Sequence, residues 1–333
     1  MVSSKVFLQL LSVALFAFSP AAAQGNNTSS GSKGLKPGQI KNLVTFGDSF
    51  TDTVEVHNGG TQWPVYVAGY ANVSLHPYAR SGAACSNNLT TLPQAFPSLF
   101  ENELPTYYND TASATGKLDP AKTLYTLWIG TNDLGDNALL TGTSKELGTS
   151  KASLVDVTKC IVNWVQDLYN HGARNFLFQN IINLEKVPLY ATDSWPNRYW
   201  NAQRNTTEWS VFMRELTLSA NALTSLQLQA LAPTLQGAHI GIFDSHSLFV
   251  DMYNNPKNYL NGTAPLNVDG AVSICVYQLN GDQSNCTEVE GTDRDSYLWF
   301  DELHPSEQAD RIVAREVAQV TKGVTNQWTT WLS

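Results

Sequence analysis

Charged residues are scarce in this sequence, and positive charge is nowhere concentrated. Asp, Glu, Lys and Arg make up 15% of the 333 residues, and the formal net charge is −9. No run of Lys or Arg occurs, so the chain lacks the basic surface with which proteins bind nucleic acid or anionic membranes. We therefore expect no nucleic-acid partner, and a substrate that is neutral or that arrives without electrostatic steering.

Several common binding and catalytic motifs are also missing. The sequence contains no Cys-x-x-Cys and no His-Glu-x-x-His, so nothing in it supports a metal site. It contains neither Gly-x-Gly nor Gly-Lys-Ser/Thr, which excludes the usual nucleotide-binding loops. Gly-x-Ser-x-Gly, the nucleophile elbow of α/β-hydrolase lipases, is absent too. We expect neither a metal nor a cofactor.

Only the N-terminus carries a long apolar stretch. Lys5, the run Val6–Phe18 and the small residues 21–23 have the order of a secretory signal peptide, which we place at residues 1–23. The stretch is too short for a membrane span, and no other stretch approaches the required length. We therefore expect a secreted, extracellular monomer without a membrane anchor. A flexible leader at 24–38 should precede a single domain at 39–333.

Glycosylation sequons and cysteines indicate the same compartment. Four cysteines fit an oxidising environment. Cys275 and Cys286 flank a short polar loop, and we predict that they pair; Cys85 and Cys160 then form a second bridge or remain two buried thiols. Eight Asn-x-Ser/Thr sequons indicate a glycosylating pathway. They begin at Asn26, Asn27, Asn72, Asn88, Asn109, Asn205, Asn261 and Asn285.

From residue 40 onward, short apolar runs alternate with longer segments of helical periodicity, which is typical of βαβ units around a parallel sheet. The predicted strands are Ile40–Phe46, Ser74–Tyr78, Thr123–Ile129, Asn175–Gln179 and His239–Phe243. The predicted helices are Gln62–Tyr70, Ala95–Leu104, Ser153–Asn170, Glu208–Leu231 and one from Ser306 to about Lys322. We therefore predict an α/β fold, a three-layer α/β/α sandwich with a five-stranded parallel sheet.

Two segments are longer than ordinary connections. Residues 183–207 contain two prolines and four large aromatic side chains, and residues 261–295 contain the Cys275/Cys286 pair. Loops of this length in a compact domain are commonly lids or binding walls. Equally, their aromatic side chains could simply cover the edges of the core.

A serine follows the first predicted strand in the Gly-Asp-Ser motif that ends at Ser49. At the carboxyl end of a strand in an open α/β sheet such a hydroxyl lies where ligands bind, although Gly-Asp-Ser is also ordinary turn chemistry. A serine nucleophile needs a base, and the base needs a third group that orients it. His304 has a suitable setting, three residues after Asp301 and directly before Pro305. We expect surface or core roles for the other histidines, His57, His76, His171, His239 and His246.

Two further segments follow the second and third predicted strands. At Gly82 the absence of a side chain lets a backbone N–H approach a ligand closely. Asn132 places a side-chain amide at the same edge of the sheet. Together with the N–H of the nucleophile, these groups are the parts of an oxyanion hole. Each is a common turn residue when taken alone, and it is the order of the whole set along the chain that makes coincidence improbable.

This ordered set resembles the SGNH, or GDSL-type, hydrolase superfamily, which is named for a Ser, a Gly, an Asn and a His in four blocks. All four blocks occur here in order between Phe46 and Ser306, nearly the whole mature chain. The resemblance implies a flavodoxin-like fold, in agreement with the predicted strands. Phe50 stands where the name motif has Leu, an apolar exchange that leaves the chemistry unchanged.

The resemblance also implies a role for each residue of the set. Ser49 would be the nucleophile, His304 the general base and Asp301 the carboxylate that orients it. The oxyanion hole would be formed by Ser49, Gly82 and Asn132.

Within the superfamily, the sequence looks most like fungal secreted acetylesterases of carbohydrate esterase family 16, through residues 46–53, Trp63-Pro64 and residues 299–306. Those enzymes remove acetyl groups from the ends of xylan-derived and other acetylated oligosaccharides. The resemblance implies an acetylated oligosaccharide or another small ester as the substrate, hydrolysed through an acetyl-serine intermediate. As sugar-stacking walls we predict Trp63, Trp195, Tyr199 and Trp200, for which core positions are equally open.

Two other functions stay open at this point. A secreted GDSL-type lipase or phospholipase would use the same residues on longer acyl chains, although no long apolar stretch lies near the motifs. A non-catalytic wall or carbohydrate-binding glycoprotein on a former hydrolase scaffold is less compatible with the presence of every motif residue.

Overall fold

A computed structural model of the chain describes residues 34–333, except for 91–95, 114, 145–147, 150–151 and 282. The predicted signal peptide and most of the predicted leader lie outside the described residues. Residues 34–38, the end of that leader, pack against the domain: Leu35 is buried, and the N–H of Gly38 donates to the carbonyl of Lys322. An apolar side chain with a place in the core holds this segment, so the domain begins earlier than the sequence indicated.

The domain is built on a six-stranded sheet with the order β12-β7-β6-β3-β1-β2. Its parallel strands are β1 (Asn42–Gly47), β2 (Ser74–Pro77), β3 (Thr123–Trp128), β6 (Asn175–Gln179) and β7 (His239–Phe243). These are the five predicted strands. The short β12 (Thr329–Trp331) adds an antiparallel edge beside β7. The predicted α/β fold is confirmed, with this sixth strand as an addition.

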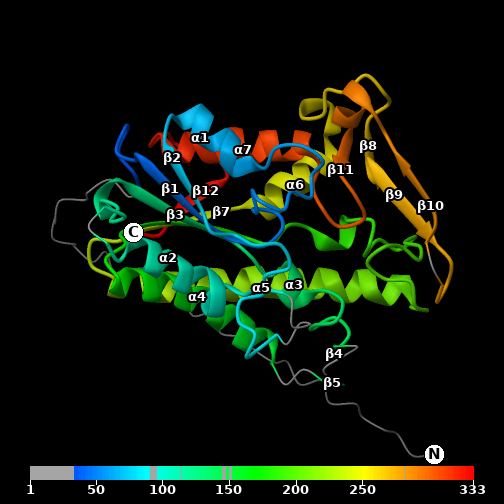
Figure 1. Cartoon of the computed structure of the whole chain (residues 1–333), viewed down its shortest axis with the longest axis horizontal. Coiled ribbons are helices and arrows are strands. Elements are labelled where there is room, and N and C mark those ends of the chain that lie inside the picture. The colour runs from blue at the N-terminus through cyan, green and yellow to red at the C-terminus, as the bar shows by residue number, and fades with distance from the viewer. Residues whose placement is uncertain (1–33, 91–95, 114, 145–147, 150–151, 282) are drawn as a thin grey trace, which may run out of the picture. The chain divides into compact units, whose positions relative to one another are not determined.

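Helices cover both faces of the sheet (Figure 1). On one face, α1 (Trp63–Ala71) packs against α7 (Glu307–Thr321), and on the other α4 (Leu154–Asn170) packs against α5 (Thr206–Leu231). The central strands β3 and β6 are buried along their whole length. Four of the six residues of β3 and three of the five of β6 are apolar, as expected for strands that are covered on both faces.

Side chains that cap the helices fix where several of them begin. Ser153 and Asp156 form a reciprocal capping box at α4, and the Asn205 side chain accepts the N–H of Glu208 at α5. Ser306 caps α7 through the N–H of Ala309. These caps satisfy backbone donors that would otherwise lack partners, and they place three helix starts within two residues of the predicted positions.

The helix predicted at Ala95–Leu104 is wrong in position. The structure has a π-helical turn, η1 (Leu99–Glu103), that runs directly into α2 (Leu104–Thr111). The Ser98 side chain caps this segment by accepting the N–H of Glu101. The cap places the start of the helical segment after Ser98, and the helix continues past Leu104.

The remaining elements are short. The other helices are α3 (Thr131–Leu134) and α6 (Ser245–Asn254), with 3₁₀ turns η2 (Pro120–Lys122), η3 (Leu184–Lys186), η4 (Ala232–Thr234), η5 (Pro256–Asn258) and η6 (Gly291–Ser296). The other strands are β4 (Thr143–Ser144), β5 (Gly148–Thr149), β8 (Asn267–Ala271), β9 (Ser273–Tyr277), β10 (Gln283–Glu288) and β11 (Tyr297–Trp299). None of the helices in the described ranges has the length and apolar character needed to cross a bilayer.

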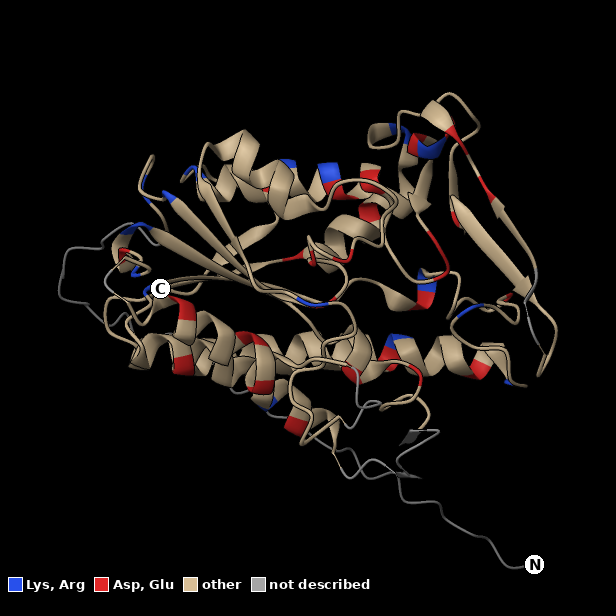
Figure 2. Cartoon of the chain, viewed as in Figure 1, with Lys and Arg blue, Asp and Glu red and all other residues tan. Residues whose placement is uncertain are grey.

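Both pairs of cysteines form disulfides. Cys275–Cys286 joins β9 to β10 in an antiparallel hairpin, which confirms the predicted pair. Cys85–Cys160 is the second bridge, one of the two outcomes that the sequence left open. It ties the segment that follows Gly82 to helix α4. Figure 2 shows the Lys and Arg positions scattered over many elements rather than gathered on one.

Candidate active site

Ser49 lies just beyond the carboxyl end of β1, where the chain turns sharply. Gly47 makes this turn possible, since its φ is 140° and an added Cβ would lie 2.1 Å from the carbonyl oxygen of Trp128. The turn is closed by bonds from the N–H groups of Thr51 and Phe50 to the backbone carbonyl and side chain of Asp48. Ser49 is therefore held at the edge of the sheet with its side chain lining a pocket.

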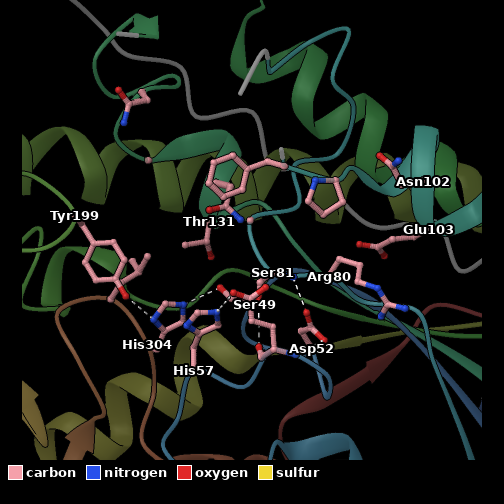
Figure 3. Close-up of a pocket in the computed structure, with 18 of the residues that line it drawn as sticks. Ser49, Asp52, His57, Arg80, Ser81, Asn102, Glu103, Thr131, Tyr199 and His304 are labelled. Atoms are coloured by element: carbon pink, nitrogen blue, oxygen red, sulfur yellow. Dashed lines mark hydrogen bonds and ion pairs between the residues drawn. The ribbon is translucent and has the colours of Figure 1, made fainter. Parts of the chain in front are cut away.

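The predicted serine and histidine meet in this pocket (Figure 3), and the predicted aspartate lies behind the histidine. Ser49 Oγ lies 2.8 Å from His304 Nε2, and His304 Nδ1 lies 3.0 Å from Asp301 Oδ1. The N–H groups of Leu303 and His304 both donate to Asp301 Oδ1, at 2.8 Å each. These two bonds form the tight turn that presents Asp301 and His304 toward the same point.

Asp301 is an ionised carboxylate over the working pH range of most enzymes. Burial by itself would raise its pKa, but His304 and the hydrogen bonds from Tyr199 and Leu303 outweigh burial and lower the pKa to about 2. The carboxylate can therefore hold the proton on His304 Nδ1, which leaves Nε2 free to accept the proton of Ser49.

Two buried acids accept backbone hydrogen bonds from the turn that carries Ser49. Glu103 Oε2 accepts the N–H of Gly47 at 3.0 Å, and Asp48 Oδ1 accepts that of Phe50 at 3.0 Å. Burial raises the pKa of Asp48 to about 7 and that of Glu103 well above its usual value. Under acidic conditions both side chains are therefore neutral, and the negative charge in contact with His304 is that of Asp301.

Gly82 and Asn132 lie on the same pocket as Ser49. Gly82 has a φ of +77°, and an added Cβ would lie 2.0 Å from the ring of Phe96. Asn132, in α3, donates from Nδ2 to the carbonyl of Ala83 at 2.9 Å, which leaves its second N–H for a ligand. Within the described part of the chain, the N–H groups of Ser49 and Gly82 donate to no protein acceptor. The residues that line the pocket thus offer three donors, these two N–H groups and the second N–H of Asn132.

The loop that carries Gly82 is fixed at several points. Asp52 Oδ2 accepts the N–H of Ser81 at 2.8 Å, and Asp133 accepts the N–H of Cys85 at 3.0 Å and the hydroxyl of Thr90 at 2.6 Å. Burial raises the pKa of Asp133 to about 6. The Cys85–Cys160 disulfide is a further anchor. The position of the Gly82 N–H is thereby set before any ligand binds.

His57 is a site residue that the sequence did not indicate. Its ring stacks on that of His304, with 4.8 Å between centroids and 16° between planes. Burial and the neighbouring His304 lower the pKa of His57. The sequence predicts a surface or core histidine here, because no local signal marks a residue whose partner is contributed by a distant turn. The stack limits the tilt of the His304 ring.

The four aromatic residues predicted to stack on sugars lie in different environments. The structure corrects Trp63, which is fully buried in the core with its Nε1 bonded to Thr51. Trp195 donates to the carbonyl of Cys275 and Trp200 packs on Trp209, and neither lines the pocket. Tyr199 does line the pocket, but its hydroxyl is bonded to Asp301.

The pocket has a volume of about 780 Å³ and extends well beyond the serine. Its wall includes the polar side chains Arg80, Asn102 and Asn137 in addition to the groups already described. Tyr190, from the long segment after β6, lines it as well, whereas none of the described residues in 261–295 does. One of the two long segments is thus a pocket wall.

A model of the GDSL-like lipase/acylhydrolase family matches residues 43–317. The chain belongs to this family. It is accordingly a carboxylic ester hydrolase, and the family resemblance drawn from the four sequence blocks is confirmed.

Relatives of this GDSL hydrolase include fungal, bacterial and plant proteins. An acetylesterase of Hypocrea jecorina is 32% identical over 330 residues, which cover 88% of this chain and 92% of the relative. The thermolabile hemolysin of Vibrio parahaemolyticus is 24% identical over 306 residues, or 86% of this chain and 65% of the hemolysin. The crystal structure of a lipolytic G-D-S-L family protein from Veillonella parvula aligns with a TM-score of 0.42 at 15% identity, over 83% of this chain and 95% of that one.

Proposed function

We propose that this hydrolase is a secreted acetylesterase that removes acetyl groups from acetylated oligosaccharides, xylo-oligosaccharides among them, and from small acetyl esters. The observation that carries the proposal is the chain of hydrogen bonds from Ser49 through His304 to Asp301, which opens into a polar pocket. The acetylesterase that is 32% identical to this chain supports acetyl as the acyl group that is removed.

In the first half of the reaction, Ser49 Oγ attacks the acetyl carbonyl carbon while His304 Nε2 takes the hydroxyl proton. The oxyanion that forms accepts hydrogen bonds from the N–H groups of Ser49 and Gly82 and from Asn132 Nδ2. Collapse of this intermediate breaks the ester bond. The departing sugar hydroxyl takes its proton from His304, and an acetyl group remains on Ser49.

In the second half, water attacks the acetyl-serine while His304 takes one of its protons. The same three donors hold the second oxyanion. When the bond to Ser49 breaks, His304 returns the proton to Oγ and acetate leaves. Asp301 stays ionised throughout and stabilises the protonated imidazole in both halves.

The size and polarity of the pocket favour a substrate whose alcohol part carries many hydroxyl groups. An acetyl group alone would fill a small part of 780 Å³. Polar side chains such as Asp52, Arg80 and Asn102 on the wall match hydroxyl groups better than they match an alkyl chain.

Substrate preference tests this proposal. We expect faster hydrolysis of 4-nitrophenyl acetate than of 4-nitrophenyl octanoate, and release of acetate from acetylated xylo-oligosaccharides. Comparison of kcat/KM on the three substrates checks it. A preference for octanoate would keep the site and replace the substrate with a longer acyl ester, as in a lipase or phospholipase.

We also propose that residues 1–23 are a signal peptide and that the mature chain is a monomer with one domain. The order of residues in that segment, the eight sequons and the two disulfides support export. Protein recovered from the medium of a secreting host should begin at Gln24. An intact N-terminus at Met1 in that protein would refute the cleavage.

A further inference from the structure

The segment between β6 and α5 is bonded to the turn that carries Asp301 and His304. Two consecutive residues of the segment bind two consecutive residues of the turn. Arg198 Nε forms an ion pair with Glu302 Oε2 at 2.7 Å, and the Tyr199 hydroxyl donates to Asp301 Oδ2 at 2.6 Å. The same hydroxyl lies 3.0 Å from His304 Nδ1. Figure 3 shows Tyr199 and Ser49 on opposite sides of the His304 ring.

The two oxygens of Asp301 have separate tasks. Oδ1 accepts the two backbone N–H groups of its own turn and lies nearer to His304 Nδ1. Oδ2 accepts the hydroxyl of Tyr199 and lies 3.1 Å from Nδ1. Burial, followed by the charge of Asp301, raises the pKa of Tyr199, so its hydroxyl keeps its proton and donates. Tyr199 is therefore the donor to Asp301 that comes from a remote part of the chain.

The backbone around Tyr199 is held in place independently of any substrate. The buried Asn197 side chain accepts the N–H groups of Tyr199 and Trp200, at 3.0 and 3.2 Å. Arg198 Nη2 donates to the carbonyl of Ser273 at 3.0 Å. Glu302, whose side chain is fully buried, also accepts the N–H of Cys275 at 2.6 Å. These bonds fix where the phenol ring lies.

We propose that Tyr199 is a positioning residue of the catalytic centre: its hydroxyl holds the Asp301 carboxylate in the orientation that aligns His304 with Ser49. The inference rests on the proposed function, because it assigns Asp301 and His304 their roles in ester hydrolysis. The two backbone bonds hold Oδ1, and the donor from Tyr199 holds Oδ2, so rotation of the carboxylate about its Cβ–Cγ bond is opposed at both oxygens. The hydrogen bond from the Tyr199 hydroxyl also stabilises the negative charge of the carboxylate.

Other groups around His304 bear on the test. Asp301, Tyr199 and Ser49 contact its ring nitrogens, and His57 covers one ring face, with Glu55 and Asp52 close to His57. Asp48 lies near on the nucleophile's side. A Tyr199→Phe exchange removes only the hydroxyl of Tyr199. It keeps the phenyl ring and does not alter the other groups around His304.

We expect Tyr199→Phe to lower kcat about tenfold, because a hydrogen bond to a charged group is lost in the state that reacts. KM should stay within about twofold of wild type, since the pocket wall is kept. The acid limb of the kcat/KM profile should move to higher pH. Without the donor, the negative charge of Asp301 is no longer stabilised by Tyr199, and the carboxylate holds the proton on His304 more strongly. The measurements are kcat, KM and the pH profile on whichever aryl ester the wild type prefers.

Tyr66→Phe is a matched control. The Tyr66 hydroxyl also donates to a carboxylate, Glu307 Oε1 at 2.8 Å, but this pair joins α1 to α7 outside the pocket. This exchange should leave kcat and the pH profile unchanged. Circular dichroism and thermal unfolding of both variants separate loss of alignment from loss of fold.

Two results would overturn the inference. In the first, the Tyr199→Phe variant has the kcat and the acid limb of the wild type. In the second, only KM changes, which would mean that Tyr199 contributes to substrate binding as part of the pocket wall. Failure of the proposed function looks different, because the wild type would then hydrolyse neither aryl ester or Ser49→Ala would keep the wild-type rate. A substrate preference for octanoate leaves the test of Tyr199 valid.

Discussion

Exchange of Ser49 for alanine should lower kcat on 4-nitrophenyl acetate by roughly 10⁵-fold or more, the scale found when a nucleophilic serine is removed from such a relay. Ser49 Oγ is the hydroxyl bonded to His304 Nε2, at 2.8 Å. The fold should survive, because the Ser49 side chain faces the pocket and His304 keeps its bonds to Asp301. Initial rates and circular dichroism of the purified variant check both points.

The neighbouring Ser81 provides a control for Ser49→Ala. Ser81 also lines the pocket, but its hydroxyl donates to the carbonyl of Glu55 at 3.0 Å and contacts no member of the relay. Ser81→Ala should keep kcat within a few-fold of wild type. Hydrolysis that persists in folded Ser49→Ala would place the nucleophile elsewhere. Inertness of the wild type toward a covalent serine reagent would instead favour a non-catalytic glycoprotein.

The second large effect is expected for Asn132→Ala. Loss of one oxyanion donor should lower kcat by roughly 10²–10³-fold with little change in KM, because the donor is needed most when charge develops on the carbonyl oxygen. The amide has one N–H on the carbonyl of Ala83 and one left for the oxyanion. Steady-state kinetics that separate kcat from KM measure this effect.

Asn163 gives a comparison on the surface. It is exposed on α4 and lines none of the catalytic pocket, so Asn163→Ala should leave kcat unchanged. If Asn132→Ala turned over at the wild-type rate, Asn132 would have no part in the oxyanion hole. A rise in KM alone would assign it to substrate binding.

The sequence predicts the sheet well because burial on both faces leaves a clear mark. Strands β6 and β7 coincide with Asn175–Gln179 and His239–Phe243 as predicted. The antiparallel β12 has three residues, two of them threonines, and it exists through its pairing with β7. A strand defined by its partner rather than by its own pattern has no local signal. The helix predicted at 95–104 is wrong for a different reason: Ser98 and Glu101 form the Ser-x-x-Glu pattern of a helix start, a local signal that the predicted bounds do not follow.

The site was predictable where chemistry and turn geometry are local. Asp301 and His304 are three residues apart in one turn, and Ser49 lies two residues after Gly47, so their arrangement can be inferred from spacing. Tyr199 meets His304 across 105 residues, and nothing near it in the sequence specifies that contact. An aromatic residue in a long loop has the same local pattern whether it faces core, substrate or carboxylate. The sequence therefore does not distinguish these positions for Tyr199, and Trp63, at the start of α1, is buried in the core rather than placed at the substrate.

The strand order bears on how the protein forms during synthesis. The sheet can grow outward as the chain emerges, because β2 joins one side of β1 and then β3, β6 and β7 add to the other side in the order of translation. The base reaches the nucleophile across 255 residues, a long loop that is closed late. A nascent chain can therefore hold most of its sheet, with Ser49 in place, while it has no means of activating that serine. Hydrolysis requires that the last part of the chain, which carries Asp301 and His304, has been synthesised and folded.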